Sequence, residues 1–174
     1  MIHLETERLI LRNLMPADAE VMYDYRNDIR CSRYQRGQTK DLLGIRELVH
    51  KRSADFITDQ NNFVIAVEIK DTKQMIGEIV VMPNDGCFSL GYTFHYDHHR
   101  KGYAYEAVKK YIDYLKDNYN YKYYIAIADI RNNPSIKLMK KLNMIYVLTE
   151  ERVYPDGRPT SEEVEYRLDI NKGE

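Results

Sequence analysis

The stretch LGYTFHYDHHRKGYAYEAV, residues 90–108, joins an alternating apolar segment to a helical one across a cluster of basic side chains. Its first half has the period of a strand, and its second half, from Tyr103 onward, has the period of a helix. Arg100 and Lys101 stand where the first amides of a helix already carry partial positive charge, and each such like charge costs about 0.3–1 kcal/mol. An anion bound at this junction would reverse that cost.

The backbone of this junction is also open. Gly102 has no Cβ, and Ala104 has a small side chain, so the amides of residues 100–104 can surround a phosphate group. From these residues alone, a phosphate site and a solvated turn with basic side chains are equally good interpretations.

The whole chain, residues 1–174, is expected to form one domain, because no linker, repeat or low-complexity segment divides it. Three strand-like runs joined by the turn formers KDTKQ and PNDGC predict an antiparallel meander. These runs are residues 62–69, 75–82 and 88–96. Residues 103–117 then predict an amphipathic helix and residues 123–130 a further strand. This change of pattern predicts a parallel pairing near the middle of the sheet, in a single α/β or α+β domain.

The ends of the chain carry the remaining expected elements. Residues 3–14 predict a strand, residues 15–28 and 41–56 predict helices, and NNPS at 132–135 opens a short helix. Two late strands are expected around YPDGRP, residues 154–159.

Composition excludes several classes of partner. The formal net charge of −1 makes the basic cluster a local feature, so nucleic acid is not an expected partner. The opening residues are broken by charges and resemble neither a signal peptide nor a membrane span. With only Cys31 and Cys87, a cytoplasmic protein without a membrane partner is expected.

Three segments in the right order carry a resemblance to a known family. Residues 90–108 resemble the acetyl-coenzyme A signature of the GNAT superfamily of N-acetyltransferases, Gln/Arg-x-x-Gly-x-Gly/Ala, with His99, Gly102 and Ala104 in its register. LETERLILRNLMPADAE resembles the start of the ribosomal-protein N-terminal (RimJ/RimL-like) branch, and NNPSIKLMKKLNMI resembles that branch's Asn-x-x-Ser helix. His99 replaces the usual Gln or Arg. Asn143 and Met144 replace a Gly-Phe pair, although Asn also tolerates the left-handed helix end.

The resemblance implies a single α+β (mixed α/β) domain whose central, mostly antiparallel sheet contains a splayed parallel strand pair that holds coenzyme A. It implies that Phe94, His95 and Tyr96 are backbone partners of the pantetheine arm. It also implies that His99 and residues Arg100, Lys101, Gly102, Tyr103 and Ala104 surround the diphosphate, and that Asn132 lies near the pantetheine amide. Asn133 and Pro134 also read as an N-cap and first-turn pair, so one of the two asparagines can be structural.

The resemblance also points to the catalytic groups. Attack on a thioester needs an unprotonated amine, a polarised carbonyl and a proton donor for the thiolate. Many relatives place a Tyr four residues after the Ser of the short helix, but that position is Met139, so Ser135 is the predicted acid. Glu78 is the predicted base, although strand alternation also allows it to face solvent. Glu68, Asp85 and water reached through hydroxyl groups remain alternatives.

The histidines do not predict a metal site. His95, Asp97, His98 and His99 span a strand end and a turn without the spacing of HExxH, so no metal is expected. His95 can act as a base towards the amine or can pack beside the cofactor channel, and the sequence leaves both open.

These features predict an acetyl-coenzyme A dependent N-acetyltransferase acting on a primary amine, either a small molecule or a protein N-terminus. A non-catalytic acyl-coenzyme A sensor is the alternative. A cysteine hydrolase lacks a nucleophile motif, and a Walker site lacks its Gly-Lys-Ser/Thr ending. The acceptor surface is expected along the first two helices and the late hairpin. There, Glu162, Glu163 and Glu165 either attract a cationic amine or form a solvated face. The sequence also leaves open whether the protein forms a homodimer.

Overall fold

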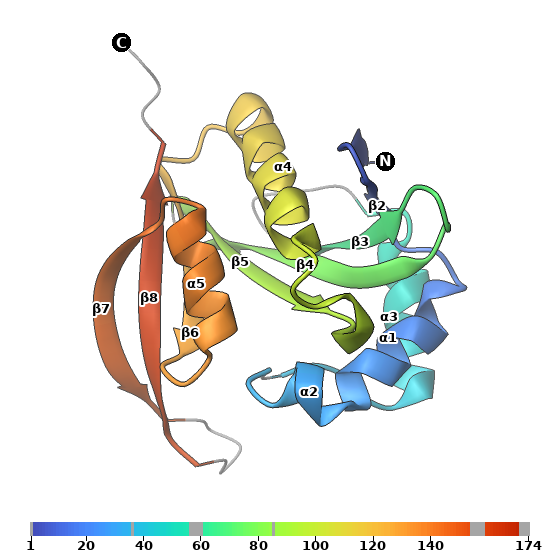
Figure 1. The fold of residues 1–174 in the computed structure, drawn as a ribbon, viewed down its shortest axis with the longest axis horizontal. Helices are drawn as coiled ribbons and strands as arrows, with labels where there is room; N and C mark the ends of the chain where they lie inside the picture. The colour runs from blue at the N-terminus through green and yellow to red at the C-terminus, as the bar shows by residue number, and fades with distance from the viewer. Residues whose placement is uncertain (1, 36, 56–60, 85, 154–158, 171–174) are drawn as a thin grey trace.

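The computed structural model describes residues 2–35, 37–55, 61–84, 86–153 and 159–170, and in them one eight-stranded sheet has the order β1-β2-β3-β4-β5-β6-β8-β7 (Figure 1). Its strands are β1 (His3–Glu5), β2 (Leu9–Asn13), β3 (Phe63–Ile69), β4 (Met75–Asn84), β5 (Cys87–Phe94), β6 (Tyr123–Asp129), β7 (Ile145–Arg152) and β8 (Ser161–Asp169). The helices are α1 (Asp18–Asn27), α2 (Ile29–Ser32), α3 (Leu42–Arg52), α4 (Tyr103–Asn118) and α5 (Asn133–Lys141), with a 3-10 turn, η1 (Tyr96–His98). The predicted mixed α/β fold is confirmed.

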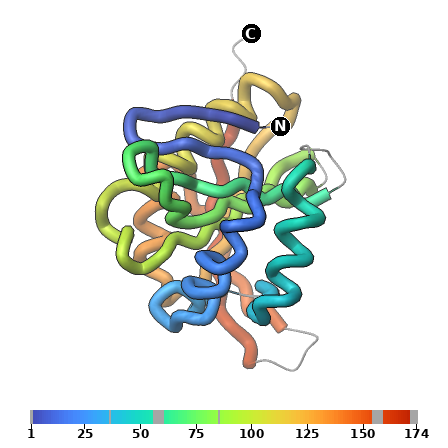
Figure 2. The backbone as a smooth tube through the Cα atoms, turned by 90° about the vertical axis from the view of Figure 1, so that its right-hand side faces the viewer, coloured from blue at the N-terminus to red at the C-terminus, as the bar shows by residue number. Residues whose placement is uncertain are grey.

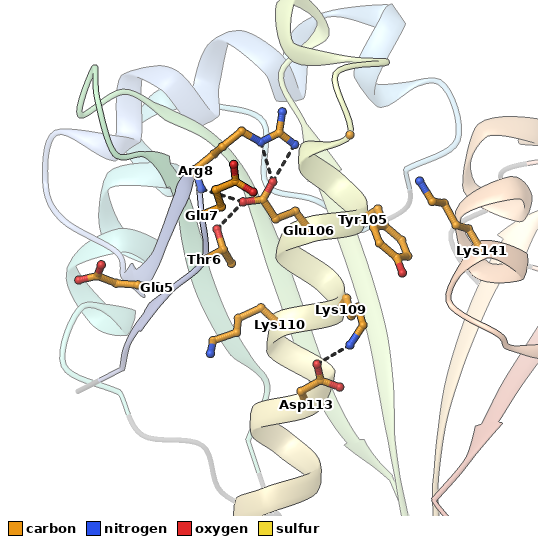
Figure 3. A pocket seen from close by; sticks show the side chains of 11 residues that line it. Glu5, Thr6, Glu7, Arg8, Tyr105, Glu106, Lys109, Lys110, Asp113 and Lys141 are labelled. Atoms are coloured by element: carbon orange, nitrogen blue, oxygen red, sulfur yellow. Dashed lines mark hydrogen bonds and ion pairs between the residues drawn. The ribbon is translucent and has the colours of Figure 1, made fainter.

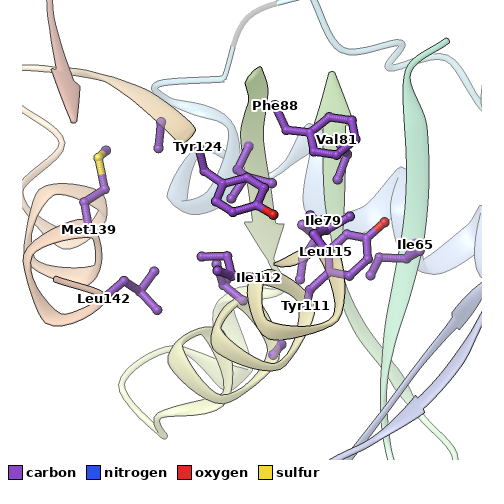
Figure 4. Packing of buried hydrophobic residues seen from close by; sticks show 14 of the residues in the cluster. Ile65, Ile79, Val81, Phe88, Tyr111, Ile112, Leu115, Tyr124, Met139 and Leu142 are labelled. Atoms are coloured by element: carbon purple, nitrogen blue, oxygen red, sulfur yellow. The ribbon is translucent and has the colours of Figure 1, made fainter. Parts of the chain in front are cut away.

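Helices cover both faces of the sheet. On one face, α4 and α5 pack over the larger core, where Tyr111, Ile112 and Leu115 of α4 are buried against the central strands (Figure 4). On the other face, α1 lies beside α3 (Figure 2). Together they cover a second core that contains Met22 and Ile45. The amphipathic stripe predicted for residues 103–117 is therefore the buried face of α4, and only Ala104, at its first turn, stays partly exposed.

The predicted parallel pairing joins β5 to β6 over a short length. Cys87, Phe88 and Ser89 pair with Tyr123, Tyr124 and Ile125, and no further pairing of the two strands occurs in the described residues. Beyond Ser89, β5 stays paired with β4 as far as Phe94, whereas β6 stays paired with β8 as far as Asp129. The two strands therefore separate. Their facing edges carry backbone groups that need partners other than each other.

Several boundaries differ from the sequence expectations. The single strand expected at residues 3–14 is an antiparallel hairpin, because the Thr6 amide donates to the Leu9 carbonyl and the Leu9 amide donates to Thr6 Oγ1. The helix expected at residues 41–56 is α3, which ends at Arg52, and Phe56 lies outside the described residues. Most of the turn expected at residues 154–159 also lies outside them. The short α2 was not expected. Asn143 has φ +61°, which confirms the left-handed end after α5.

Among the described residues, the helices are all too short or too polar to cross a membrane.

Candidate functional site

The loop between β5 and α4 has the open backbone that its sequence predicts. Arg100 and Gly102 both have positive φ angles, +62° and +85°. Gly102 is the N-cap residue of α4 and offers no side chain to the first-turn amides. Because the first amides of a helix have no partner within the helix, this end can receive an acceptor from outside.

Arg8 of the N-terminal hairpin contacts both this loop and α4, and Figure 3 shows its bonds to Glu106 of α4. Its Nη1 donates to the Lys101 carbonyl at 3.0 Å, and its Nε donates to Glu106 Oε2 at 2.7 Å. Thr6 Oγ1 donates to the other carboxylate oxygen of Glu106 at 2.5 Å. Burial opposes the charge of Glu106, but the hydrogen bonds from Thr6 and Arg8 outweigh it and lower the pKa of Glu106. Neither Arg8 nor Glu106 was predicted as part of the site, although the segment Thr6–Arg8 lies in one of the matched motifs.

A surface basin of about 500 Å³ adjoins this loop and runs along the exposed side of α4. Gly102 and Tyr105 line it together with Lys109, Lys110 and Lys141. The Lys141 ammonium lies 4.3 Å from the centre of the Tyr105 ring, so α5 contributes a cation to a basin formed mainly by α4 (Figure 3). Carboxylates also line the basin, and Asp113 pairs with Lys109 at 2.7 Å, so Lys110 and Lys141 are the cations best suited to an anionic group of a ligand that continues outward from the loop.

The groups predicted to meet the pantetheine arm already have partners within the chain. His99 Nε2 donates to the Phe94 carbonyl at 2.8 Å, and the His95 amide donates to the Ile76 carbonyl at 2.8 Å. The His95 and Tyr96 carbonyls accept from the His98 and His99 amides. A carbonyl oxygen can accept a second hydrogen bond, whereas an amide has one proton to donate. The cofactor roles of Phe94, His95, Tyr96 and His99 therefore stay predictions. The backbone carbonyls of this segment are the groups that can still accept a hydrogen bond from a ligand.

The side chain of His95 points to α1. The Asp97 amide donates to Nδ1 at 3.3 Å, so Nε2 carries the proton and donates to Asp24 Oδ2 at 2.8 Å. His95 is 9% exposed. This arrangement ties the end of β5 to α1 and favours packing over a role as base. In the parts of the chain that the structure describes, no group of three or more His, Cys, Asp or Glu side chains is arranged to hold a metal ion.

Ser135 lies in the first turn of α5 and does not cap it. The cap is Asn132, whose Oδ1 accepts from the Ser135 amide at 3.3 Å. Ser135 Oγ instead lies 2.8 Å from the hydroxyl of Tyr92 on β5. Burial raises the pKa of Tyr92 to about 12, although its hydrogen bond with Ser135 acts in the opposite direction. Sequence reasoning missed Tyr92, since strand alternation alone does not identify what its hydroxyl meets.

Glu78 is fully buried beneath α1 and does not face solvent. Arg26 binds both of its carboxylate oxygens, with Nε at 3.0 Å and Nη2 at 2.6 Å, and Gln38 Nε2 donates to one of them at 3.2 Å. Burial opposes the charge of Arg26, but attraction to Glu78 outweighs it and raises the pKa of Arg26. Both oxygens of Glu78 are therefore already bound within the chain, and its role as base stays a prediction.

The alternative bases have similar limits. Glu68 is 6% exposed and pairs with Arg12 at 2.7 Å, while Asp85 lies outside the described residues. Of the three glutamates expected near the acceptor, Glu163 is buried and pairs with Arg152 at 3.1 Å. Its charge is therefore already balanced within the hairpin.

Comparisons with known proteins identify the family and the fold. The family described as Acetyltransferase (GNAT) domain matches residues 8–145. The uncharacterized N-acetyltransferase p20 of Bacillus licheniformis is 31% identical over 150 residues, which cover 80% of each chain. An acetyltransferase (GNAT family) structure from Bacillus anthracis superposes with a TM-score of 0.85 at 22% identity, covering 97% of this chain and 98% of that one. The ribosomal L7/L12 alpha-N-protein acetyltransferase RimL, in complex with coenzyme A, has a TM-score of 0.82 at 9% identity, covering 99% and 100%.

Proposed function

This chain belongs to the acetyltransferase (GNAT) family, and we propose that it moves the acetyl group of acetyl-coenzyme A directly to a primary amine in a ternary complex. The acceptor is a small molecule or a protein N-terminus. The observation that carries the proposal is the separation of β5 from β6, with the loop at Gly102 beyond the end of β5 and a pair of hydroxyls across the gap.

Three features of the described residues support a donor bound along this path. The proposal assigns its diphosphate to Arg100, Lys101, Gly102, Tyr103 and Ala104, where Gly102 has φ +85° and leaves the backbone without a side chain. The anionic nucleotide end would continue into the basin beside Lys141, which Figure 3 shows. The pantetheine arm would lie between β5 and β6, where it supplies partners for the separated strand edges, with Asn132 close by.

The proposed chemistry needs two proton movements. The amine nitrogen forms a bond to the acetyl carbon as the bond from that carbon to sulfur breaks, and the sulfur must gain a proton. Ser135 Oγ is the proposed donor, because its hydroxyl lies at the gap and not at the helix cap. The proton that the amine loses goes to Glu78 or to water. The ion pair of Glu78 with Arg26 opposes the first route, because that carboxylate already has a cationic partner.

An acceptor panel tests the proposal. The protein is incubated with acetyl-coenzyme A and, separately, with peptides that begin with a free Ala or Ser, with spermidine and with an aminoglycoside. We expect thiol release and a mass increase of one acetyl group with at least one of these amines. Binding of acetyl-coenzyme A in calorimetry without acetylation of any amine would instead favour the acyl-coenzyme A sensor.

Gly102→Glu is expected to weaken acetyl-coenzyme A binding by well over tenfold, which is about 1.4 kcal/mol or more. The new side chain would place a negative charge beside the diphosphate, and a Cβ at residue 102 already lies 3.3 Å from Arg8 Nη2. Calorimetry measures the affinity, and circular dichroism shows whether the variant is folded. Higher salt should also weaken binding to the unaltered protein, since part of the attraction is between charges.

Gly86→Glu is the matched control for this variant. Gly86 has φ +72°, close to the +85° of Gly102, but it precedes β5 in the turn after β4, with nothing near its Cβ position. The control therefore adds the same charge and a similar backbone strain away from the loop. Equal affinities of the two folded variants would contradict the assignment of the loop.

A further inference from the structure

Two hydroxyl groups meet across the gap between the separated strands. Tyr92 lies on β5 beyond Ser89, the last residue of β5 that pairs with β6. Ser135 lies in the first turn of α5, the helix that follows β6. Their oxygens are 2.8 Å apart, a distance typical of a short hydrogen bond between hydroxyls. The contact therefore joins β5 to the helix that follows β6, the two segments that are expected to enclose the donor.

Both partners are held in place by their surroundings. The Tyr92 ring packs against the larger core, and Gln35 Nε2 donates to the Tyr92 carbonyl at 3.0 Å. The Ser135 amide is bonded to the Asn132 cap. Met139, one turn further along α5, is fully buried and carries no hydroxyl, whereas Tyr92 of β5 does place a phenol against Ser135.

Either hydroxyl of the pair can donate to the other, and the arrangement that matters for catalysis is the one in which Tyr92 donates. Burial raises the pKa of Tyr92 to about 12, so its phenol stays protonated at neutral pH and can donate. A serine hydroxyl has one proton and two lone pairs. When Tyr92 donates to Ser135 Oγ, the Ser135 proton must point elsewhere, and it is free to turn towards a sulfur held in the gap.

We propose that Tyr92 is a positioning residue that acts through Ser135, so that the two hydroxyls together protonate the departing thiolate. This inference rests on the proposed function. As the carbon–sulfur bond breaks, its electron pair goes to sulfur, which takes the proton of Ser135. The Ser135 oxygen takes the proton of Tyr92, and the phenolate recovers a proton that the amine nitrogen releases through water. The net result is the movement of one proton from nitrogen to sulfur.

The test does not require the acceptor amine. The affinities of coenzyme A and of desulfo-coenzyme A, which lacks the thiol, are measured by calorimetry from pH 6.5 to 10. Hydrogen-bond donors stabilise a thiolate and lower the pKa of the bound thiol, so the preference for coenzyme A should grow as the pH rises. Tyr92→Phe should lose about tenfold of that preference at high pH, because hydrogen bonds to charged groups are the stronger ones. Its affinity for desulfo-coenzyme A should be unchanged.

Tyr124→Phe is the matched control, since the Tyr124 hydroxyl is buried without a hydrogen-bond partner among the described residues. It should keep the full preference. Ser135→Ala should lose the preference, and Tyr92→Phe combined with Ser135→Ala should lose no more than Ser135→Ala alone, because both residues act on one sulfur.

The outcomes separate this inference from the function beneath it. A folded Tyr92→Phe or Ser135→Ala protein that keeps the full preference for coenzyme A would overturn the inference and leave the function standing. Equal affinity of the unaltered protein for the two ligands at every pH would do the same. Failure of both ligands to bind the unaltered protein would overturn the proposed function, and the inference with it.

Discussion

Glu78→Gln is expected to lower the free energy of unfolding by about 3–5 kcal/mol, the loss usually seen when one partner of a buried ion pair is removed. The side chains of Arg26 and Glu78 are 4% and 0% exposed, so the guanidinium would keep its charge in the interior without a carboxylate to balance it. Urea denaturation at neutral pH measures the change.

Two further variants show whether burial is the cause. Glu20→Gln breaks the ion pair with Arg46, in which both side chains are 55% exposed, and should lower stability by less than about 1 kcal/mol. Replacing both members of the buried pair, as Arg26→Met with Glu78→Leu, should lower stability much less than Glu78→Gln, since no unpaired charge remains. If Glu78→Gln is no more damaging than Glu20→Gln, the buried pair does not contribute as described.

Glu78→Gln also decides whether Glu78 takes part in catalysis. If Glu78 is the base, Glu78→Gln should lower kcat per folded molecule by roughly 10²–10⁴-fold and should remove the acidic limb of the pH–rate profile. A folded variant that keeps the original profile would assign the proton to water, and Glu78 would then be a structural partner of Arg26.

Ser135→Ala is expected to lower kcat by about 100-fold with little change in the affinity for acetyl-coenzyme A. The reason is the position of the hydroxyl, which lies 2.8 Å from Tyr92 at the gap between β5 and β6. The cap of α5 uses the backbone amide of Ser135, which alanine retains, so the loss of stability should be limited to the hydrogen bond with Tyr92, about 0.5–1.5 kcal/mol. Turnover and affinity are measured from pH 6 to 9 with any amine that the panel identifies.

Asn132→Ala is the comparison for this variant. It removes the side chain that caps α5 and should cost about 1 kcal/mol of stability. Together the two variants separate the cap from the hydroxyl. If Ser135→Ala keeps full kcat, the proton of the thiolate comes from water or from another hydroxyl.

The sequence by itself determined the features that depend on neighbouring residues. The meander β3–β4–β5 and the buried stripe of α4 were predicted, because each face of a strand or helix repeats with a fixed local period. The left-handed conformation of Asn143 followed from the resemblance, in which Asn stands at the position of a helix-ending Gly. The hairpin β1–β2 was not, since its turn depends on hydrogen bonds of Thr6 that alternation does not reveal.

Tertiary structure alone decided which side chains meet. Tyr92 and Ser135 are 43 residues apart in sequence, Arg26 and Glu78 are 52 apart, and Arg8 and Glu106 are 98 apart. Periodicity assigns a residue to a face, but it does not say which helix will cover that face or how far along the strand it will lie. Glu78 therefore reads from sequence as an available carboxylate, and only the packing of α1 onto β4 supplies the arginine that binds it.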